Sequence, residues 1–340
     1  MRYTVTSMPE LLADHTTLRL GGPAAEFVVA STEAELIAAI DDADQRAMPL
    51  LVLGGGSNLV VADEGFDGRV VQVATQGVSE DASRITLQAG ESWDGFVEWA
   101  VAQGRSGIEA LSGIPGRVGA TPIQNVGAYG QEVAQRITSV RVWDRRTRDV
   151  ATFAAGECAF GYRMSRFKAE PDRYVVLAVT FDLEANSLSA PLAYAELAAA
   201  VDAEIGDRRP LHQVRNAVLG LRAGKGMVLD SSDHDTWSAG SFFTNPIVEA
   251  QAVPAGAPSW PQPDGTVKTS AAWLIDHAGF VRGYGNERVS LSTKHTLALT
   301  NRGAASTTDL LALASEIRSG VVAAYGITLE PEPVLVNCSL

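Results

Sequence analysis

Apolar positions recur with helical spacing in several stretches of the chain. These stretches lie at residues 32–45, 92–104, 194–206, 210–224, 270–279 and 307–326. Thr32 and Glu35 form a capping box at the start of the first stretch, and Ser92 stands as the cap of the second. We predict an α-helix over each of these ranges.

Runs of β-branched and apolar residues between turn signals predict the strands. Residues 49–73 indicate strand, glycine turn, strand, turn and strand, residues 137–153 a hairpin, and residues 173–183 and 327–336 single strands. Residues 229–268 are rich in Pro, Gly, Ser and Asp with little periodicity, so we predict a boundary that carries loops. The pattern predicts an α+β chain of about three parts.

Length, charge and cysteine count exclude several classes of protein. With 340 residues, 46% of them hydrophobic, the chain can form more than one packed domain. No apolar run reaches the ~18 residues of a membrane helix, and residues 1–15 lack the pattern of a secretion signal, so we expect a cytoplasmic protein. The net charge of −13 argues against nucleic-acid and anionic membrane partners. Cys158 and Cys338 fit no metal-site spacing and are expected as free thiols.

The first glycine loop consists of residues 53–58, LGGGSN. It differs from the dinucleotide fingerprint, which requires a helix directly after the glycines, because a strand pattern follows Asn58. Residues 54–57 can still point several backbone N–H groups into one concavity that holds a pyrophosphate. A plain hairpin turn is the alternative interpretation.

The second glycine region covers residues 112–130. Its glycines follow neither helical nor strand periodicity, so we expect the backbone to approach another group closely there. Gln124 and Asn125 add side-chain donors and acceptors that suit a ring edge or a diphosphate better than a protein core. Two such loops in succession indicate a large nucleotide cofactor.

Two further motifs resemble known sites without meeting their requirements. Residues 220–226, GLRAGKG, have too few residues between the glycines for a P-loop and no Ser or Thr after Lys225. Residues 230–235, DSSDHD, place acids beside His234, but no second histidine stands at ligand spacing. We therefore expect a solvated loop there, and no metal.

Motifs along nearly the whole chain resemble the UDP-N-acetylenolpyruvoylglucosamine reductases, also called UDP-N-acetylmuramate dehydrogenases or the MurB family. These are flavoenzymes of bacterial cell-wall synthesis. The motifs occur in the family's order: TTLRLGGPA, LGGGSNLVV, GIPGRVGATPIQNVGAYG, GYRMSRFK, AGSFFTNP, SAAWLID and LEPEP. Each motif is weak alone, and their common order makes the resemblance specific.

The resemblance implies a two-part FAD-binding domain of the vanillyl-alcohol-oxidase (PCMH) type and a C-terminal α+β substrate domain. The parts correspond to residues 1–76, 77–226 and 227–332, and the strand at 333–340 would return to the first part. It also implies non-covalent FAD reduced by NADPH. The residues expected to bind FAD are Gly54, Gly55, Gly56, Ser57, Asn58, Ile114, Pro115, Gly116, Gly119, Ala120, Ile123, Gln124, Asn125, Gly127, Ala128 and Arg222.

The resemblance also assigns the catalytic residues. Ser241 matches the proton donor for C2 of the substrate, and it lacks the G-x-S-x-G elbow of a nucleophile. Arg163 matches the arginine that neutralises the substrate carboxylate, with a surface salt bridge as the alternative. Glu332 matches the acid that polarises the enolate as a protonated or proton-sharing carboxyl group, with a rigid proline-flanked tail as the alternative.

At the nucleotide end the resemblance implies contacts from four side chains. Tyr194 matches a tyrosine on a mobile loop that closes over UDP, and Tyr162 is expected beside the flavin or the substrate. Lys225 and Asn245 match diphosphate or sugar contacts. The sequence leaves Arg222 as an alternative contact for the diphosphate.

Two departures from the family pattern affect these assignments. The acidic stretch between Lys225 and Ser241 is longer than the usual Pro-containing loop. In addition, the dipeptide at 333–334 replaces the Val-Arg often found after the acid. One basic contact is then either missing or supplied elsewhere, with Lys294 and Arg288 as the candidates.

These assignments predict a monomeric enzyme that reduces UDP-N-acetylglucosamine enolpyruvate. One alternative is a flavin oxidase or dehydrogenase of the same fold with another substrate; such relatives often attach FAD through a histidine, and neither glycine region contains one. The other is a non-catalytic nucleotide-binding protein, which would bind flavin without turnover. That alternative does not account for the joint presence of Ser241, Arg163 and Glu332.

Overall fold

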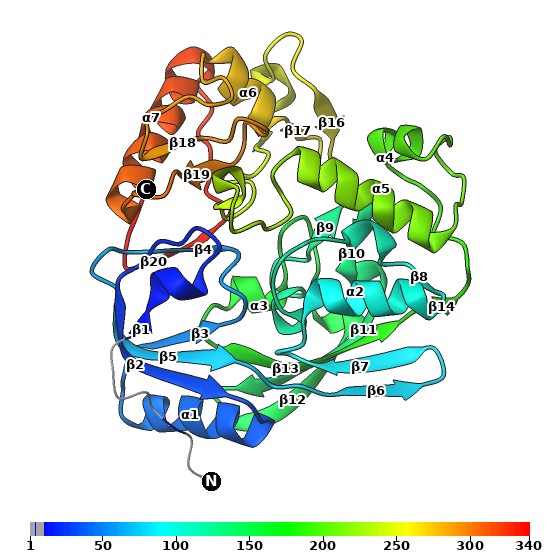
Figure 1. Ribbon diagram of the computed structural model, residues 1–340, viewed down its shortest axis with the longest axis vertical. Coiled ribbons are helices and arrows are strands. Elements are labelled where there is room, and N and C mark those ends of the chain that lie inside the picture. Colours follow the sequence, from blue (N-terminus) through cyan, green and yellow to red (C-terminus); the bar gives the residue numbers. More distant parts are fainter. Residues whose placement is uncertain (1–3, 5–9) are drawn as a thin grey trace. The chain divides into compact units, whose positions relative to one another are not determined.

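The computed structural model describes residue 4 and residues 10–340, which form two compact units. The first unit contains Ala25–Gly55 and Asp67–Ala223, and the second contains Glu10–Ala24, Gly56–Phe66 and Gly224–Leu340. Figure 1 labels their elements. The division into three parts, with breaks after residues 76 and 226, stays a prediction. Most of the N-terminal stretch considered for a secretion signal lies outside the described residues.

The described residues form seven α-helices, of which six fall within the predicted ranges and the short α3 was not predicted. They are α1 (Glu33–Gln45), α2 (Trp93–Ala102), α3 (Arg166–Ala169), α4 (Ala195–Ala200), α5 (Leu211–Gly224), α6 (Ala271–His277) and α7 (Thr307–Tyr325). The capping box of Thr32 and Glu35 starts α1, and Ser92 caps α2. Helix α4 is shorter than predicted, since the backbone turns at Asp202, whose φ is 50°. Among residues 4 and 10–340, no helix has both the length and the apolar character needed to cross a bilayer.

Two sheets form most of the first unit. Strands β2 (Pro23–Ala30), β5 (Phe66–Val73) and β3 (Leu50–Leu53) lie side by side, and β3 runs parallel to β5. The other sheet has the order β12-β11-β13-β7-β6, with β6 (Val78–Asp81), β7 (Arg84–Gln88), β11 (Ile137–Asp144), β12 (Asp149–Ala154) and β13 (Tyr174–Asp182). The predicted hairpin at 137–153 is the antiparallel pair β11–β12. Two short pairs complete the unit: β8 (Arg105–Ser106) with β14 (Glu184–Ala185), and β9 (Gly127–Ala128) with β10 (Gln131–Glu132).

Aromatic residues join helix α2 to the five-stranded sheet. Trp93 and Phe96 on α2 pack against Phe181 on β13, with ring centroids 5.8 and 5.3 Å from it. Each such side chain buries about 150–250 Å². The indole N–H of Trp93 also donates to the Leu111 carbonyl at 3.1 Å, which anchors the start of the second glycine region. The core therefore supports that region directly.

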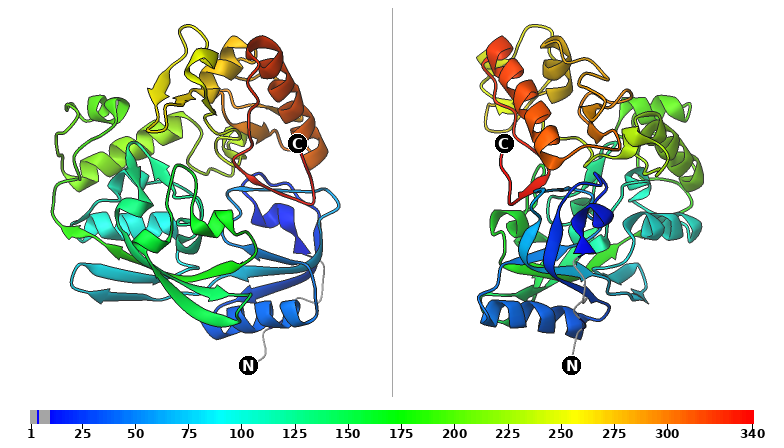
Figure 2. Two further views of the ribbon diagram at one scale, coloured as in Figure 1. Left: turned by 180° about the vertical axis from the view of Figure 1, so that it is seen from behind. Right: turned by 60° about the vertical axis from the view of Figure 1, so that its left-hand side comes forward.

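Ion pairs fasten helix α1 to the β11–β12 hairpin. Its acids Glu33, Asp44 and Asp41 pair with Arg141, Arg145 and Arg148, respectively. Both views in Figure 2 show α1 next to one end of this hairpin. These partly exposed ion pairs connect α1 to the five-stranded sheet, although pairs of this kind contribute little to stability.

The second unit is built from helices α6 and α7 and short strands. The strands are β1 (Glu10–Leu11), β4 (Leu59–Val61), β15 (Ile247–Val248), β16 (Ser259–Pro261), β17 (Val267–Thr269), β18 (Val289–Leu291), β19 (Leu299–Asn301) and β20 (Val334–Val336). Strand β20 runs parallel to β4, with Val334 opposite Leu59 (Figure 1). The predicted loop region 229–268 contains β15, β16 and part of β17, so that prediction was partly wrong. Strands of two or three residues are too short to show periodicity.

Both cysteines are free thiols, as predicted. Burial raises the pKa of Cys158 to about 11, so its thiol is protonated at neutral pH. Cys158 belongs to the apolar core of the first unit.

Candidate active site

The two glycine loops touch each other through their backbones. Gly54 and Gly55 follow strand β3, and a Cβ atom on Gly55 would lie 2.7 Å from the Cα of Gly116. Only glycine permits this approach. The next element is strand β4 and not a helix, as predicted. Two side-chain-free stretches in contact fit the close approach of a pyrophosphate to backbone N–H groups.

Other glycines of the second region approach the protein itself. A Cβ atom on Gly119 would lie 2.5 Å from the Cβ of Ala89, and one on Gly130, whose φ is 83°, would lie 2.7 Å from the Cβ of Ala193. The predicted close approach is therefore confirmed, and at these two positions the partner is a neighbouring chain segment. Gly119 and Gly130 shape the loop by packing.

The side chain of Asn125 corrects one interpretation. It is 1% exposed, and its amide group donates to Glu132 at 2.7 Å and to the Gly161 carbonyl at 3.1 Å. Its oxygen accepts from Ala134 N–H at 3.1 Å. These bonds hold the loop in a left-handed backbone conformation, with φ of 47°. The side chain thus serves the protein interior, and a cofactor contact at Asn125 is left to its backbone.

Two carboxylates, one half-buried and one fully buried, support the second glycine region and the residues just before and after it, and neither was singled out from the sequence. Asp94, on α2, accepts from Gly113 N–H at 2.6 Å and from Arg215 at 2.7 and 3.0 Å. Burial alone would raise the pKa of Asp94, but these bonds outweigh it and leave the pKa below its usual value. Glu109 is fully buried and accepts from Gly107 N–H at 2.6 Å. Their positions beside the glycines are the only sequence hint.

Arg163 lies against the second glycine region. Its guanidinium donates to the Gly127 carbonyl at 3.0 Å and lies 5.6 Å from the ring centre of Tyr162. The backbone of Arg163 has φ of 51°, a left-handed conformation that is uncommon for a bulky residue. Such local strain occurs where the fold fixes a functional side chain. The Arg163 guanidinium donates to the carbonyls of Asn125 and Gly127, and these bonds give no support to the surface salt-bridge alternative.

Tyr194 packs against the same region through Tyr129. The two rings meet edge to face, with centroids 5.5 Å apart, and the Tyr194 side chain is 46% exposed. Just before it, Ala190 N–H donates to the buried Glu109 at 2.7 Å, and Glu109 also accepts from Gln131 at 2.9 Å. One carboxylate therefore ties the base of the tyrosine segment to the glycine region.

In the second unit, the Ser241 segment pairs with the Glu332 segment. Phe243 forms an antiparallel bridge with Pro331, and Glu332 N–H donates to the Phe242 carbonyl at 2.8 Å. Ser241 is half-buried, and its hydroxyl makes no hydrogen bond within the described part of the chain. The structure thus brings the backbones of two predicted catalytic residues together, and the proline-flanked acid belongs to a paired segment instead of the rigid tail considered as the alternative.

The end of the first glycine loop supports the acid. Asn58 donates its side-chain amide to the Glu332 carbonyl at 3.4 Å and accepts Val334 N–H at 2.9 Å. Gly56 is also required by packing, because a Cβ there would lie 1.9 Å from the His15 carbonyl oxygen. Asn58 therefore has a structural task besides the predicted cofactor contact.

The predicted nucleotide contacts lie in different surroundings. Asn245 accepts Ala271 N–H at 2.9 Å and so holds the start of helix α6. Burial lowers the pKa of Arg222, on α5, although the guanidinium stays charged at neutral pH. Lys225 is half-buried, just after α5 ends.

The two basic residues expected to replace the family's arginine are both paired with carboxylates. Lys294 bonds Asp233 at 2.5 Å, and Arg288 bonds Asp309 at 2.6 Å. Asp309 lies in the first turn of α7, where it completes a capping box with Ser306, whereas Arg288 directly precedes β18. The expectation that either residue offers an uncommitted charge to the substrate is not supported by these contacts.

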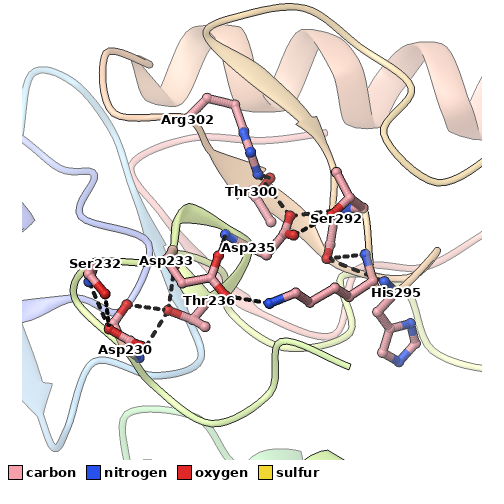
Figure 3. Close-up of polar contacts among 11 residues, drawn as sticks. Asp230, Ser232, Asp233, Asp235, Thr236, Ser292, His295, Thr300 and Arg302 are labelled. Carbon is pink, nitrogen blue, oxygen red and sulfur yellow. Dashed lines mark hydrogen bonds and ion pairs between the residues drawn. The ribbon is translucent and has the colours of Figure 1, made fainter. Parts of the chain in front are cut away.

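The acidic stretch 230–235 was predicted as a solvated loop, and for Asp235 this is wrong. Asp235 is 5% exposed and accepts from Arg302 at 2.8 Å and from both polar groups of Thr293 (Figure 3). His234 packs on Trp237, with ring centroids 4.4 Å apart. Across the described chain, no group of three or more His, Cys, Asp or Glu side chains is placed to hold a metal.

Two family models match the chain. The model of the "UDP-N-acetylenolpyruvoylglucosamine reductase, C-terminal domain" matches residues 231–336, and the "FAD binding domain" model matches residues 24–150. The first match covers Ser241 and Glu332, and the second covers both glycine loops.

Relatives named UDP-N-acetylenolpyruvoylglucosamine reductase match almost end to end. The Streptomyces avermitilis protein is 56% identical over 346 residues, which covers 97% of this chain and 94% of the relative. The Streptomyces coelicolor protein is 57% identical over 343 residues, covering 97% and 90%. The crystal structure of the Thermus caldophilus reductase (MurB) covers 99% of both chains at 28% identity, with a TM-score of 0.69. This chain therefore belongs to the UDP-N-acetylenolpyruvoylglucosamine reductase (MurB) family.

Proposed function

We propose that this chain reduces UDP-N-acetylglucosamine enolpyruvate to UDP-N-acetylmuramate in peptidoglycan precursor synthesis. It is an FAD-dependent oxidoreductase that uses NADPH, as its family membership implies. The observation that carries the proposal is the pairing of the Ser241 and Glu332 segments, through the 2.8 Å bond from Glu332 N–H to the Phe242 carbonyl. This pairing brings the backbone of the proposed proton donor next to that of the proposed acid, which suits protonation of an enolate whose charge the acid stabilises.

The touching glycine loops are the proposed site for FAD. Gly54, Gly55 and Gly116 leave room for a pyrophosphate against the backbone, and Asp94 and Glu109 hold the second loop rigid. FAD held there would supply hydride transfer from NADPH to C3 of the enolpyruvyl group. The protein would bind and orient the cofactor and keep water away from the reacting atoms.

Ser241 is the proposed proton donor to C2. Hydride addition at C3 leaves negative charge at C2 and in the adjoining carboxylate, and such an enolate is basic enough to take a proton from a hydroxyl group. The hydroxyl of Ser241 has no hydrogen bond within residues 4 and 10–340, so it is not already committed as a donor. Its half-buried position limits competition from bulk water.

Arg163 and Glu332 are the proposed stabilisers of the charge that develops on the substrate. A guanidinium group fits a carboxylate with two parallel hydrogen bonds, and the bonds to the Gly127 and Asn125 carbonyls fix the orientation of Arg163. Glu332 is proposed to act as a protonated or proton-sharing carboxyl group, because an ionised carboxylate would repel the enolate.

The nucleotide end of the substrate is assigned to side chains at the edges of these segments. Tyr194, exposed and close to Tyr129, is the proposed cover for UDP, and Tyr162 is proposed beside the flavin or substrate. Lys225 is the proposed diphosphate contact, with Arg222 as its alternative. Asn245 is proposed to contact the sugar or the diphosphate.

The proposed partner is one small molecule, a UDP-sugar, and we propose a monomer that works in the cytoplasm. The net charge of −13 supports the view that nucleic acid and anionic membranes are not partners.

The visible spectrum of the purified protein tests the proposed function. We expect a flavin spectrum that bleaches with NADPH under nitrogen and returns on addition of UDP-N-acetylglucosamine enolpyruvate. A protein that binds no FAD even after reconstitution, or reduced flavin that the substrate leaves reduced, would contradict the proposal.

A further inference from the structure

An ion pair with a buried carboxylate anchors the stretch between Lys225 and Ser241. Between Lys225 and Ser241 the chain has one short 3-10 turn, His234–Thr236, and Asp235 in that turn is 5% exposed. Its carboxylate accepts from Arg302 at 2.8 Å, from Thr293 N–H at 3.0 Å and from the Thr293 hydroxyl (Figure 3). All of these donors belong to the β18–β19 hairpin and the residue that follows it, here called the 292–302 segment.

The charge of Asp235 strengthens this anchor. Burial alone would raise the pKa of Asp235, but the hydrogen bonds from Thr293 and Arg302 outweigh it and leave the pKa below its usual value. Hydrogen bonds to an ionised acceptor are about twice as strong as neutral ones. A neutral side chain of the same shape would therefore hold the segment less firmly.

The 292–302 segment also holds the backbone on both sides of Ser241. Phe242 N–H donates to the Leu297 carbonyl at 2.7 Å, and Asn301 N–H donates to the Trp237 carbonyl at 3.0 Å. Asp235, Trp237 and Phe242 are thus bound to one segment, with Ser241 between the last two.

A second set of hydrogen bonds also holds the stretch between Lys225 and Ser241 in place. Lys294 bonds Asp233 at 2.5 Å, and Asp233 accepts Asp235 N–H at 3.0 Å, which braces the turn from its other side. The hydroxyl of Thr17 donates to the Ser238 carbonyl at 2.6 Å. In contrast, Asp230 is exposed, and its carboxylate accepts from the N–H and the hydroxyl of Ser232, two residues further along the chain.

We infer that Asp235 is a positioning residue for the proton donor: its bonds to Thr293 and Arg302 fix the place of Ser241 on the 292–302 segment. The inference rests on the proposed function, because it concerns the step in which Ser241 protonates C2. A misplacement of a reacting group by about 1 Å can lower a rate by about 10²-fold.

The chemistry of this step provides a readout that general loss of stability does not change. Hydride forms a C–H bond at C3, the electron pair of the C2–C3 double bond moves toward C2 and the carboxylate, and C2 takes the proton of the Ser241 hydroxyl. Water then restores the hydroxyl proton. Because C2 becomes a stereocentre at protonation, a displaced hydroxyl lets water protonate either face and yields two epimers.

The test compares Asp235→Asn with the matched control Asp230→Asn in the holoenzyme. Reduction of the flavin by NADPH and its reoxidation by UDP-N-acetylglucosamine enolpyruvate are measured separately by stopped flow. We expect Asp235→Asn to slow reoxidation about 10- to 10²-fold, to leave reduction unchanged and to produce a second C2 epimer. Asp230→Asn loses the same charge at an exposed position. It should match the unsubstituted protein in the rate of flavin reduction, the rate of flavin reoxidation and the configuration of the product at C2.

A second pair of variants covers the case in which Asp235→Asn does not fold. Thr293→Val removes one donor to Asp235 and keeps the size of the side chain, whereas Thr293→Ser keeps the hydroxyl. We expect the valine variant to slow reoxidation and the serine variant to restore it. Hydrogen exchange of residues 237–242 should be faster in the valine variant, with no change in residues 112–130.

Two results would overturn the inference: an equal loss in both half-reactions, or unchanged reoxidation with a single epimer in Asp235→Asn and Thr293→Val. Reduced flavin in the unsubstituted protein that the substrate fails to reoxidise would instead contradict the proposed function. The result with the unsubstituted protein therefore distinguishes failure of the proposed function from failure of the inference about Asp235.

Discussion

The two units hold their functional residues in different ways. In the first unit the glycine region 112–130 is held partly by residues close to it in the sequence: Asp94 accepts Gly113 N–H, 19 positions away, and the Asn125 amide donates to Glu132, 7 positions away. In the second unit the Ser241 segment is held by residues far away in the sequence. The Thr17 hydroxyl and the Ser238 carbonyl that it bonds are 221 positions apart.

This difference follows from the kind of group that each unit is proposed to position: backbone N–H groups in the first unit and a side-chain hydroxyl in the second. A pyrophosphate is bound by backbone N–H groups, which a short glycine-rich stretch can supply by itself. A proton donor has to be fixed by its side chain in one position, which requires support from several directions. We therefore expect FAD binding in the first unit to be most sensitive to substitutions that move the backbone. We expect proton transfer in the second unit to be most sensitive to substitutions of side chains.

The largest effect is expected from Ser241→Ala. Loss of the hydroxyl should slow reoxidation of the flavin by substrate about 10²-fold or more, while its reduction by NADPH stays intact, because the hydroxyl acts only in protonation. Stopped-flow absorbance resolves both half-reactions. Equal slowing of the two would show that Ser241 is structural, and the contrast between the units would fail.

Substitutions of Glu332 should rank next. Glu332→Ala removes a neutral donor from the enolate and should slow reoxidation about 10²-fold. Glu332→Gln keeps a neutral donor in nearly the same place, so its rate of flavin reoxidation at neutral pH should fall much less. Reoxidation of pre-reduced flavin, measured across pH in both variants, is the check. If reoxidation is slowed equally in the two variants at every pH, Glu332 acts as a charged ligand or has only a structural role.

Gly55→Ala tests the backbone side of the comparison. The new Cβ would lie 2.7 Å from Gly116 Cα and must push the two glycine loops apart, at a cost of about 1–3 kcal/mol. We expect weaker FAD binding in a titration of the apoprotein. The matched control is Gly220→Ala in helix α5, where a Cβ meets no atom within 4 Å and alanine should add up to about 1 kcal/mol of stability. Normal FAD affinity in Gly55→Ala would remove Gly55 from the proposed cofactor site.

The smallest effect is expected from Lys225→Ala. A diphosphate contact remote from the reacting carbons contributes uniform binding, so KM should rise about tenfold, equivalent to about 1.4 kcal/mol, with kcat nearly unchanged. Lys268→Ala removes a lysine that lies over the Trp260 ring instead and serves as the control. An unchanged KM in Lys225→Ala would move the contact to Arg222.

Local features of the sequence determined most of the secondary structure. The capping box at Thr32, the cap at Ser92 and the hairpin at 137–153 each depend on residues close together in the chain, and all three are present. The glycine loop without a following helix was also predicted correctly, since the strand pattern after Asn58 is local. Motifs in a common order were enough to indicate the family.

Tertiary structure alone decided which polar residues work as supports. Asp235 looked like part of a solvated acidic loop because its partners, Thr293 and Arg302, lie 58 and 67 positions away. Asn125 looked like a ligand contact, yet its amide is used inside the protein by Glu132 and Gly161. A sequence shows that a side chain can make hydrogen bonds, but only the fold determines which donors reach it and whether water is excluded.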